Sequence, residues 1–277
     1  MPTEGSDNNT CAGPLLSPDE PAPFHVRNPE STSPILLVCD HASRRFPAKL
    51  GTMGLDPFAR RCHLAIDIGA GPLTEHLAAS LGATSVLCGY SRLIVDCNRQ
   101  LMDPGAFLEF SDGVVIPGNR NLHQDEKDQR ADSIYWPYHN AIDTEIARLT
   151  GLGVEPVFVS IHSFTPVMNG ESRTWEMGVL WDKDRLTAEM FVNGLRDAGY
   201  LVGDNEPYSG KAPQDFTIDH HAEPIGLPHV GIEIRQDLIH HHDGVERIGG
   251  ILHELILAIA ARRNPASIAS RQPGKIA

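Results

Sequence analysis

The sequence lacks the features by which membrane, disulfide-rich secreted and nucleic-acid-binding proteins are identified. No apolar run approaches the roughly 20 residues needed to span a bilayer. The five cysteines form no Cys-x-x-Cys pair and are odd in number, so we expect no disulfide framework and a reducing, cytoplasmic compartment. Lys and Arg number 23 against 36 Asp and Glu, and the net charge of −13 argues against nucleic acid or an anionic membrane as the main partner.

Both ends of the chain also lack the hydrophobic patterns of packed elements. Residues 1–30 carry neither the basic nor the apolar region of a signal peptide, and we predict a flexible leader there. Residues 265–277 are predicted to form a flexible tail. We therefore predict a single domain over residues 31–264, which is long enough to bury a sizeable core.

Short apolar runs bounded by turn residues indicate strands that are buried on both faces of a sheet. The clearest of these runs are at 34–39, 157–161 and 229–234. Further extended segments are expected at 83–88, 93–95, 178–181 and 200–202. Two polar segments, 100–130 and 204–228, are predicted to be long loops.

Apolar residues recur at helical spacing between these strands. The spacing predicts helices over 70–81, 134–149, 185–198 and 245–262. Pro137 falls in the first turn of the second helix, and Asp243 with Glu246 predicts a capping box at the start of the last one. Strands that alternate with helices predict an α/β fold around a mostly parallel or mixed sheet flanked by helices.

Ionisable residues stand at the ends of three of the predicted strands. His41 follows the first strand, His162 follows the second, and Glu233 lies at the end of the third. In open α/β sheets the ligand site lies in the crevice at the carboxyl ends of the strands. We therefore expect these residues to converge at one site although they are far apart in the sequence.

The two histidines are the best candidates for metal ligands, because imidazole suits zinc and catalytic zinc takes three protein ligands. The third ligand should be a carboxylate, either Asp67 or Asp40. Adjacent strand positions point to opposite faces, which disfavours Asp40 as a partner of His41. Asp67 lies in a turn before a helix and is preferred, although a helix-capping role would also explain an Asp there.

Glu233 is the candidate general base, which would take a proton from the attacking water and later deliver it to the leaving amine. A buried ion pair with Arg235 or Arg92 is the alternative explanation for this carboxylate. Arg92 is itself a candidate to polarise the carbonyl of the bond that is cleaved, or to bind a carboxylate.

Four further residues are candidates for binding the substrate. Asn98 and Arg99 follow an extended stretch, and a guanidinium binds a carboxylate through two parallel hydrogen bonds. Tyr208 and His220 lie in the second predicted loop, from which they would reach the substrate. The run of histidines at 240–242 precedes a helix and is interpreted as solvated.

Five segments together resemble the N-formylglutamate amidohydrolase family. They are CDHAS at 39–43, the segment around Asp67, YSRLIVDCNR at 90–99, SIHSFTP at 160–166 and IEIRQD at 232–237. The resemblance covers about residues 34–260, and the chain is more distantly similar to aspartoacylases and zinc carboxypeptidases. Those two groups use His-x-x-Glu for the first two metal ligands, whereas this chain has Arg44 at the Glu position.

The resemblance implies a three-layer α/β fold of the zinc-exopeptidase, or phosphorylase/hydrolase-like, type. It also implies one zinc ion, or another divalent metal, held by His41, Asp67 and His162, with Glu233 in acid–base work. The resemblance further implies that Arg92, Asn98 and Arg99 bind the carboxylate or the carbonyl of the substrate.

The predicted function is metal-dependent hydrolysis of the amide bond of a small anionic N-acyl amino acid. The leading substrate is N-formyl-L-glutamate, which would yield formate and L-glutamate. The alternatives are a related deacylase or exopeptidase on the same scaffold, or a non-catalytic metal-binding module in which a fourth protein ligand closes the site.

Overall fold

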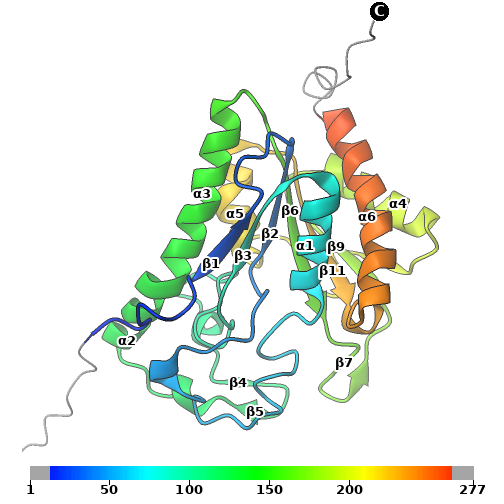
Figure 1. Cartoon of the computed structure of the whole chain (residues 1–277). Helices are drawn as coiled ribbons and strands as arrows, with labels where there is room; N and C mark the ends of the chain where they lie inside the picture. The colour runs from blue at the N-terminus through cyan, green and yellow to red at the C-terminus, as the bar shows by residue number, and fades with distance from the viewer. Residues whose placement is uncertain (1–12, 264–277) are drawn as a thin grey trace, which may run out of the picture.

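A seven-stranded mixed sheet forms the centre of the molecule (Figure 1), in a computed structural model that describes residues 13–263. The strand order is β1-β3-β2-β6-β11-β9-β10. The strands are β1 (Phe24–Arg27), β2 (Ile35–Cys39), β3 (Thr84–Cys88), β6 (Val157–Phe164), β9 (Met177–Leu180), β10 (Val202–Asp204) and β11 (His229–Arg235). The predicted α/β fold around a mixed sheet is confirmed.

The four central strands of the sheet are parallel to one another, and the strands on either side of them run in the opposite direction. β3, β2, β6 and β11 pair in parallel, whereas β1 pairs antiparallel with β3 and β9 pairs antiparallel with β11. Because parallel strands run in the same direction, the carboxyl ends of these central strands meet at one edge of the sheet.

Helices cover both faces of the sheet. Figure 1 shows α3 and α5 on one side, with α1, α4 and α6 on the other. The helices are α1 (Ala70–Leu81), α2 (Gln124–Arg130), α3 (Trp136–Gly151), α4 (Arg185–Asp197), α5 (Phe216–His221) and α6 (His242–Arg263). A π-helical turn, Ala131–Tyr135, joins α2 to α3.

The alternation of side chains along β2 divides the core into two halves. Leu36 and Val38 pack on the side of α3, and Leu37 and Cys39 pack on the side of α1, α4 and α6. Every residue of β2 is buried. This explains why the strand reads as a continuous apolar run rather than an alternating one.

Most of the predicted elements are present, and three predictions of local structure are wrong. Residues 93–95 form a turn rather than a strand, with the Ile94 amide donating to the Ser91 carbonyl. The expected loops contain helices, α2 within 100–130 and α5 within 204–228. The last helix begins at His242, so Asp243 lies within its first turn and not at its N-cap.

The ordered fold begins earlier than the predicted domain. The expected leader contains β1, which extends the sheet, and Leu15, whose side chain is 1% exposed. The four-residue β1 is too short to show a pattern, and its register is set by the distant β3. Residues 1–12 and the predicted tail lie outside the described residues, and no helix within residues 13–263 is long and apolar enough to cross a membrane.

Two small hairpins lie beyond the strand ends, below the sheet in Figure 1. One pairs β4 (Phe110–Ser111) with β5 (Val114–Val115), and the other pairs β7 (Val167–Met168) with β8 (Glu171–Ser172). Their tips are joined by a hydrogen bond of 2.8 Å from the Asn169 amide to Asp112 Oδ1. The two hairpins together wall one side of the region where the strand ends converge.

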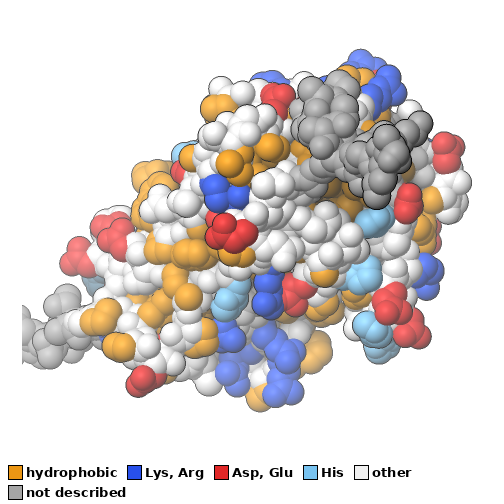
Figure 2. Space-filling model, turned by 45° about the horizontal axis from the view of Figure 1, so that its top comes forward, with side chains coloured by type: hydrophobic (Ala, Val, Ile, Leu, Met, Phe, Trp, Pro, Cys, Tyr) orange, Lys and Arg blue, Asp and Glu red, His pale blue; other side chains and the backbone are white. Residues whose placement is uncertain are grey.

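Charged side chains of both signs are distributed over the surface. On the face shown in Figure 2, Lys and Arg side chains gather near the lower centre, and Asp and Glu side chains are scattered on either side. The net charge of −13 is therefore not concentrated in one acidic surface on this face.

Candidate active site

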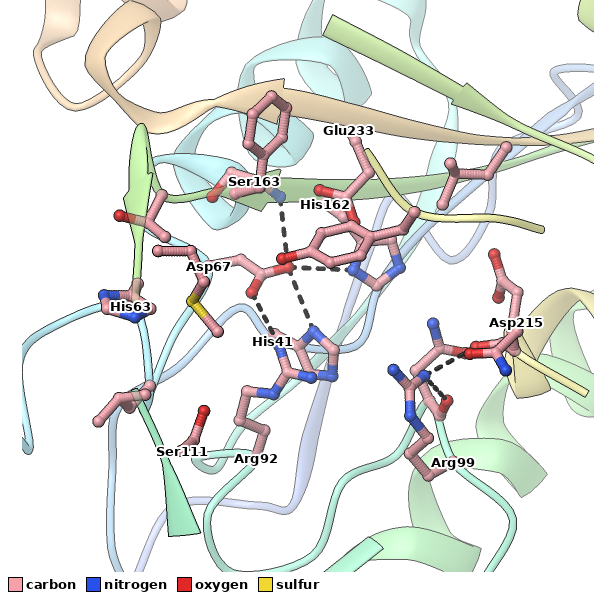
Figure 3. Close-up of a pocket in the computed structure, with 18 of the residues that line it drawn as sticks. His41, His63, Asp67, Arg92, Arg99, Ser111, His162, Ser163, Asp215 and Glu233 are labelled. Carbon is pink, nitrogen blue, oxygen red and sulfur yellow. Dashed lines mark hydrogen bonds and ion pairs between the residues drawn. The ribbon is translucent and has the colours of Figure 1, made fainter. Parts of the chain in front are cut away.

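A cavity of about 430 Å³ opens where the central strands end, and Figure 3 shows the side chains that surround it. The β4–β5 hairpin contributes Ser111 and the β7–β8 hairpin contributes Met168. The ionisable residues of the lining are His41, His63, Asp67, Arg92, Arg99, His162, Asp215 and Glu233. A concave site with this density of charged groups suits a small polar ligand.

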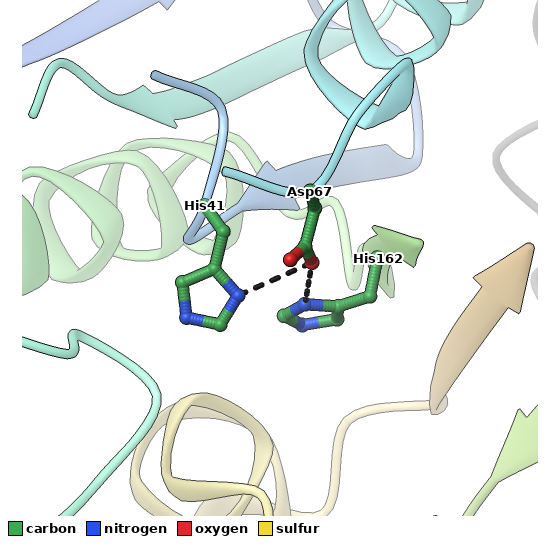
Figure 4. Close-up of side chains that lie close together, drawn as sticks. All are labelled: His41, Asp67 and His162. Atoms are coloured by element: carbon green, nitrogen blue, oxygen red, sulfur yellow. Dashed lines mark hydrogen bonds and ion pairs between the residues drawn. The ribbon is translucent and has the colours of Figure 1, made fainter. Parts of the chain in front are cut away.

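Three buried side chains form a cluster at the floor of the cavity (Figure 4). His41 Nδ1 lies 3.2 Å from Asp67 Oδ2, and His162 Nδ1 lies 3.0 Å from the same oxygen. The three side chains come from the end of β2, the turn before α1, and β6. The structure thus brings together the residues that the sequence predicted as metal ligands.

Local backbone structure fixes Asp67 in this position. Its amide donates to the His41 carbonyl over 3.1 Å, which ties the turn to the end of β2. Gly69 is the N-cap of α1 with φ 85°, and no side chain caps that helix. The alternative role of Asp67 as a helix cap is therefore not realised, and its carboxylate is free to face the histidines.

Each histidine of the cluster is oriented by a second carboxylate on its outer nitrogen. His41 Nε2 lies 2.8 Å from Asp96 Oδ1, and His162 Nε2 lies 3.1 Å from Asp40 Oδ2. Asp40 therefore supports His162 and does not join the cluster. Carboxylates in this position fix the tautomer and the ring orientation of histidines that bind metals.

Electrostatic pairing keeps the cluster charged despite its burial. Burial alone would raise the pKa of Asp67, but His41, His162 and Arg92 together lower it below its ordinary value. Burial alone would lower the pKa of His162, but hydrogen bonds to Asp40 and Asp67 raise it well above its usual range. Positive and negative charges are thus balanced around a common centre.

The donor atoms of the cluster fit a zinc ion. Two imidazoles and a carboxylate are a common set of protein ligands for catalytic zinc, and the remaining coordination position is left for water or substrate. Both Nδ1 atoms face the same carboxylate oxygen, and both outer nitrogens are held by other carboxylates. This arrangement agrees with the predicted ligand set, whose role stays a prediction.

Glu233 stands beside the cluster, and no cation within residues 13–263 forms an ion pair with it. It lies on β11 directly opposite His162 of β6, and its Oε2 atom is buried without a hydrogen bond. Burial raises the pKa of Glu233 to about 7. The alternative of a buried ion pair is wrong, because Arg235 bonds to Asp237 and Arg92 to Asp96.

Space for Glu233 is provided by a glycine on the neighbouring strand. Gly178 of β9 lies opposite Glu233, and a Cβ atom there would approach the Glu233 Cβ to 3.3 Å. The same Cβ would lie 2.4 Å from the Glu206 carbonyl oxygen, so no larger residue fits without a shift of the backbone.

Arg92 is bound more tightly than a free substrate anchor would be. Its Nη2 donates to Asp96 over 2.7 Å, and its Nη1 lies 3.3 Å from Asp67 Oδ1. The side chain nevertheless lines the cavity, and its position is fixed by these two carboxylates. Such a preset donor is suited to stabilising charge that develops during a reaction.

Three of the four predicted substrate-binding residues line the cavity, namely Asn98, Arg99 and Tyr208. Arg99 Nη1 donates to the carbonyl oxygens of Asn98 and Gln214 over 2.8 and 2.7 Å, and no carboxylate among the described residues pairs with it. His220 is the exception, because the helix α5 holds it beside Asp143 and His221 and outside the cavity lining.

Several residues of the site were not found from the sequence. Asp96 orients His41, and Asp215 lines the cavity with a buried Oδ2 atom that has no hydrogen bond. Gln236, Ser163 and His63 also line the cavity. Asp96 carried a usable signal, since it directly precedes Cys97-Asn98-Arg99, whereas Asp215 lies in a predicted loop.

Comparison with known proteins identifies the family and the fold. A family model for N-formylglutamate amidohydrolase matches residues 33–240. The crystal structure of gene product Atu2144 from Agrobacterium tumefaciens is 37% identical, with a TM-score of 0.87 over 90% of this chain and 98% of that one. The N-formylglutamate amidohydrolase from Ralstonia eutropha JMP134 is 21% identical, with a TM-score of 0.68 over 88% of this chain and 99% of that one, and shares the fold. No curated protein matches significantly.

Proposed function

The chain belongs to the N-formylglutamate amidohydrolase family and is an amidohydrolase, and we propose that it hydrolyses N-formyl-L-glutamate to formate and L-glutamate with the aid of zinc. One observation carries the proposal. The buried carboxylate of Glu233, whose Oε2 atom has no hydrogen bond, lies beside the cluster of His41, Asp67 and His162. A base without a salt-bridge partner beside a zinc-type donor set suits hydrolysis of an amide.

Glu233 acts as the proton carrier in this proposal. A general base works best when its pKa is near the working pH, and burial raises the pKa of Glu233 to about 7. It takes the proton from the attacking water and delivers it to the nitrogen of the leaving amino acid. When bound, zinc held by His41, Asp67 and His162 would supply Lewis-acid chemistry at the carbonyl.

Three arginine and amide groups orient the substrate in the proposal. Arg92, held by Asp96 and Asp67, donates to the carbonyl oxygen as negative charge develops on it. Arg99 has no carboxylate partner among the described residues and binds the α-carboxylate, with Asn98 beside it. Tyr208 lines the same cavity and contacts the rest of the substrate.

The substitution Glu233→Gln tests the role of the base. We expect kcat for N-formyl-L-glutamate to fall by about 10²- to 10⁴-fold, because proton transfer is lost, while KM changes little. Release of formate measures the rate, and Glu254→Gln on the exposed face of α6 is the matched control. Near-normal turnover of the Glu233→Gln variant would falsify the assignment.

The acyl group and the amino acid are tested by a substrate panel. N-formyl, N-acetyl and dipeptide derivatives of glutamate, aspartate and leucine separate a formylglutamate hydrolase from a related deacylase or exopeptidase. We expect the highest kcat/KM with N-formyl-L-glutamate. A clear preference for acetyl or dipeptide substrates would move the chain to the alternative activity.

We further propose that the activity resides in one cytoplasmic domain, which includes β1 in addition to the predicted residues 31–264, and that it acts on a small anionic substrate and not on nucleic acid or membranes. The single sheet that contains all seven strands of the core supports one domain. Limited proteolysis should leave one resistant fragment that retains activity, and two separately stable fragments would contradict the proposal.

A further inference from the structure

Arg173 is a cation without an anionic partner at the margin of the cavity. No carboxylate in residues 13–263 forms an ion pair with it, and its Nη1 atom is buried without a hydrogen bond. The buried Nη1 atom loses hydration without gaining an acceptor, which is unfavourable unless a ligand supplies one.

The position of Arg173 is fixed by the hairpin that walls the cavity. It follows β8 directly, and its amide donates to the Pro166 carbonyl over 2.8 Å, which closes the base of the β7–β8 hairpin. The tip of that hairpin is held by the bond from the Asn169 amide to Asp112. Arg173 is therefore presented to the site by a segment tied at both ends.

The guanidinium packs over the rings of two aromatic side chains of the cavity wall. It lies 4.6 Å from the ring centre of Tyr208 and 5.6 Å from that of Phe164, and both rings line the cavity. Tyr208 is 40% exposed and presents its side chain to the cavity that Arg173 adjoins. Aromatic faces hold the cation in place without neutralising its charge.

The charge of Arg173 also acts inside the cavity. Burial lowers the pKa of His63, and the positive charge of Arg173 contributes to the same effect. His63 lines the cavity on the opposite side of the cluster from Arg99 (Figure 3). The charge of Arg173 therefore reaches a side chain of the lining, where it acts against the carboxylate of Asp112.

An acyl amino acid with two carboxylates needs two cationic anchors, and the cavity lining itself offers only one. Of the two arginines in the lining, Arg92 is engaged by Asp96 and Asp67, which leaves Arg99 for one carboxylate. Arg173 is a further cation beside the cavity that forms no ion pair with a carboxylate of residues 13–263. Resting on the proposed function, we infer that Arg173, with the Tyr208 hydroxyl, binds the side-chain carboxylate of the substrate and determines specificity for dicarboxylic acyl amino acids.

Two substrates of the same shape test this inference. N-formyl-L-glutamate and N-formyl-L-glutamine differ in the charge of the side chain alone, so only the first engages Arg173 as an anion. Arg173→Gln should lower kcat/KM for N-formyl-L-glutamate by about 10- to 100-fold, mainly through KM, and change that for N-formyl-L-glutamine by less than about threefold. Arg173→Lys should retain part of the preference, because it keeps the charge.

The controls separate this role from a structural one. Arg247→Gln on the exposed face of α6 should leave both substrates unaffected. If Arg173→Gln lowers kcat/KM equally for both substrates, or for neither, the inference is wrong and the residue merely supports Tyr208 or the hairpin. If the wild-type protein hydrolyses neither substrate, the proposed function fails instead, and the inference falls with it.

Discussion

Within residues 13–263, two groups of histidine and aspartate bring their ligand atoms within 4.8 Å of one another, yet they differ in burial and in how their rings are held. The first, called here the buried cluster, is His41, Asp67 and His162. The second, called here the α5 cluster, is Asp143, His220 and His221. All three side chains of the buried cluster are buried at the cavity, whereas Asp143 and His220 of the α5 cluster are exposed.

The two groups also differ in how their rings are held. In the buried cluster both outer nitrogens meet carboxylates, Asp96 and Asp40. In the α5 cluster the outer nitrogen of His221 meets another histidine, His139, at 2.9 Å, and burial lowers the pKa of that second ring to about 3. Ligand-type side chains that lie close together are therefore not sufficient for a metal site, which also needs oriented, desolvated donors that face a cavity.

Removal of one histidine from each group should have very different effects on activity. His162→Ala should lower amidohydrolase activity by about a thousandfold or more, because metal chemistry supplies several kcal/mol of transition-state stabilisation. His220→Ala should change activity by less than about twofold. Turnover of N-formyl-L-glutamate by folded protein, checked by circular dichroism, measures both variants, and equal losses would remove the distinction.

A second prediction concerns the carboxylates that orient the rings. Asp96→Asn should weaken zinc affinity by about 10- to 100-fold, as expected for loss of a partner that fixes a ligating histidine. Asp143→Asn, its counterpart in the α5 cluster, should leave that affinity unchanged. Competition against a chromophoric chelator measures the zinc affinity of both variants. A larger effect of Asp143→Asn than of Asp96→Asn would place the metal in the α5 cluster and contradict the prediction.

The smallest expected effect concerns stability near the α5 cluster. Burial raises the pKa of Asp219 on α5 from its ordinary value of 3.8 to about 7, and the carboxylates of Asp215, Glu223 and Asp182 add to this against the charge of Lys183. Because the folded state holds the proton more tightly than the unfolded chain, stability falls as pH rises from about 4 to about 7.

Asp219→Asn removes this loss of stability at high pH, because an asparagine side chain does not ionise. The variant should gain about 1 kcal/mol at pH 8, a value discounted because the side chain is only half-buried, and gain less at pH 5. Urea unfolding at the two pH values measures the difference, with the exposed Asp197→Asn as control. A gain that is equal at both pH values would show that the effect does not come from ionisation.

The parts of the site that follow strands were predictable, and the parts that depend on loops were not. His41, His162 and Glu233 stand next to apolar runs, and runs of that kind fix both the strand and the edge at which it ends. Asp215 and Arg173 lie in segments without a periodic pattern, so their place beside the cavity is decided by contacts with distant residues such as Tyr208.

Two errors show how tertiary contacts override local patterns. Leu93 and Ile94 are buried, so their apolar character was read correctly, but the segment is a turn that carries Arg92 to its carboxylates. His220 was expected at the substrate because a loop can reach it, whereas the helix α5 stacks its ring on Phe216 at 4.9 Å. In both segments contacts with distant residues, and not the local pattern, decide the conformation.

The central claim is that the buried cluster holds a catalytic zinc ion, and elemental analysis of metal content tests it most directly. Protein purified without added metal or chelator should contain about one zinc per chain in the wild type and in His220→Ala, and almost none in His162→Ala. Folded wild-type protein that carries no metal and binds no zinc when supplied, or zinc that is lost in His220→Ala and kept in His162→Ala, would contradict the account.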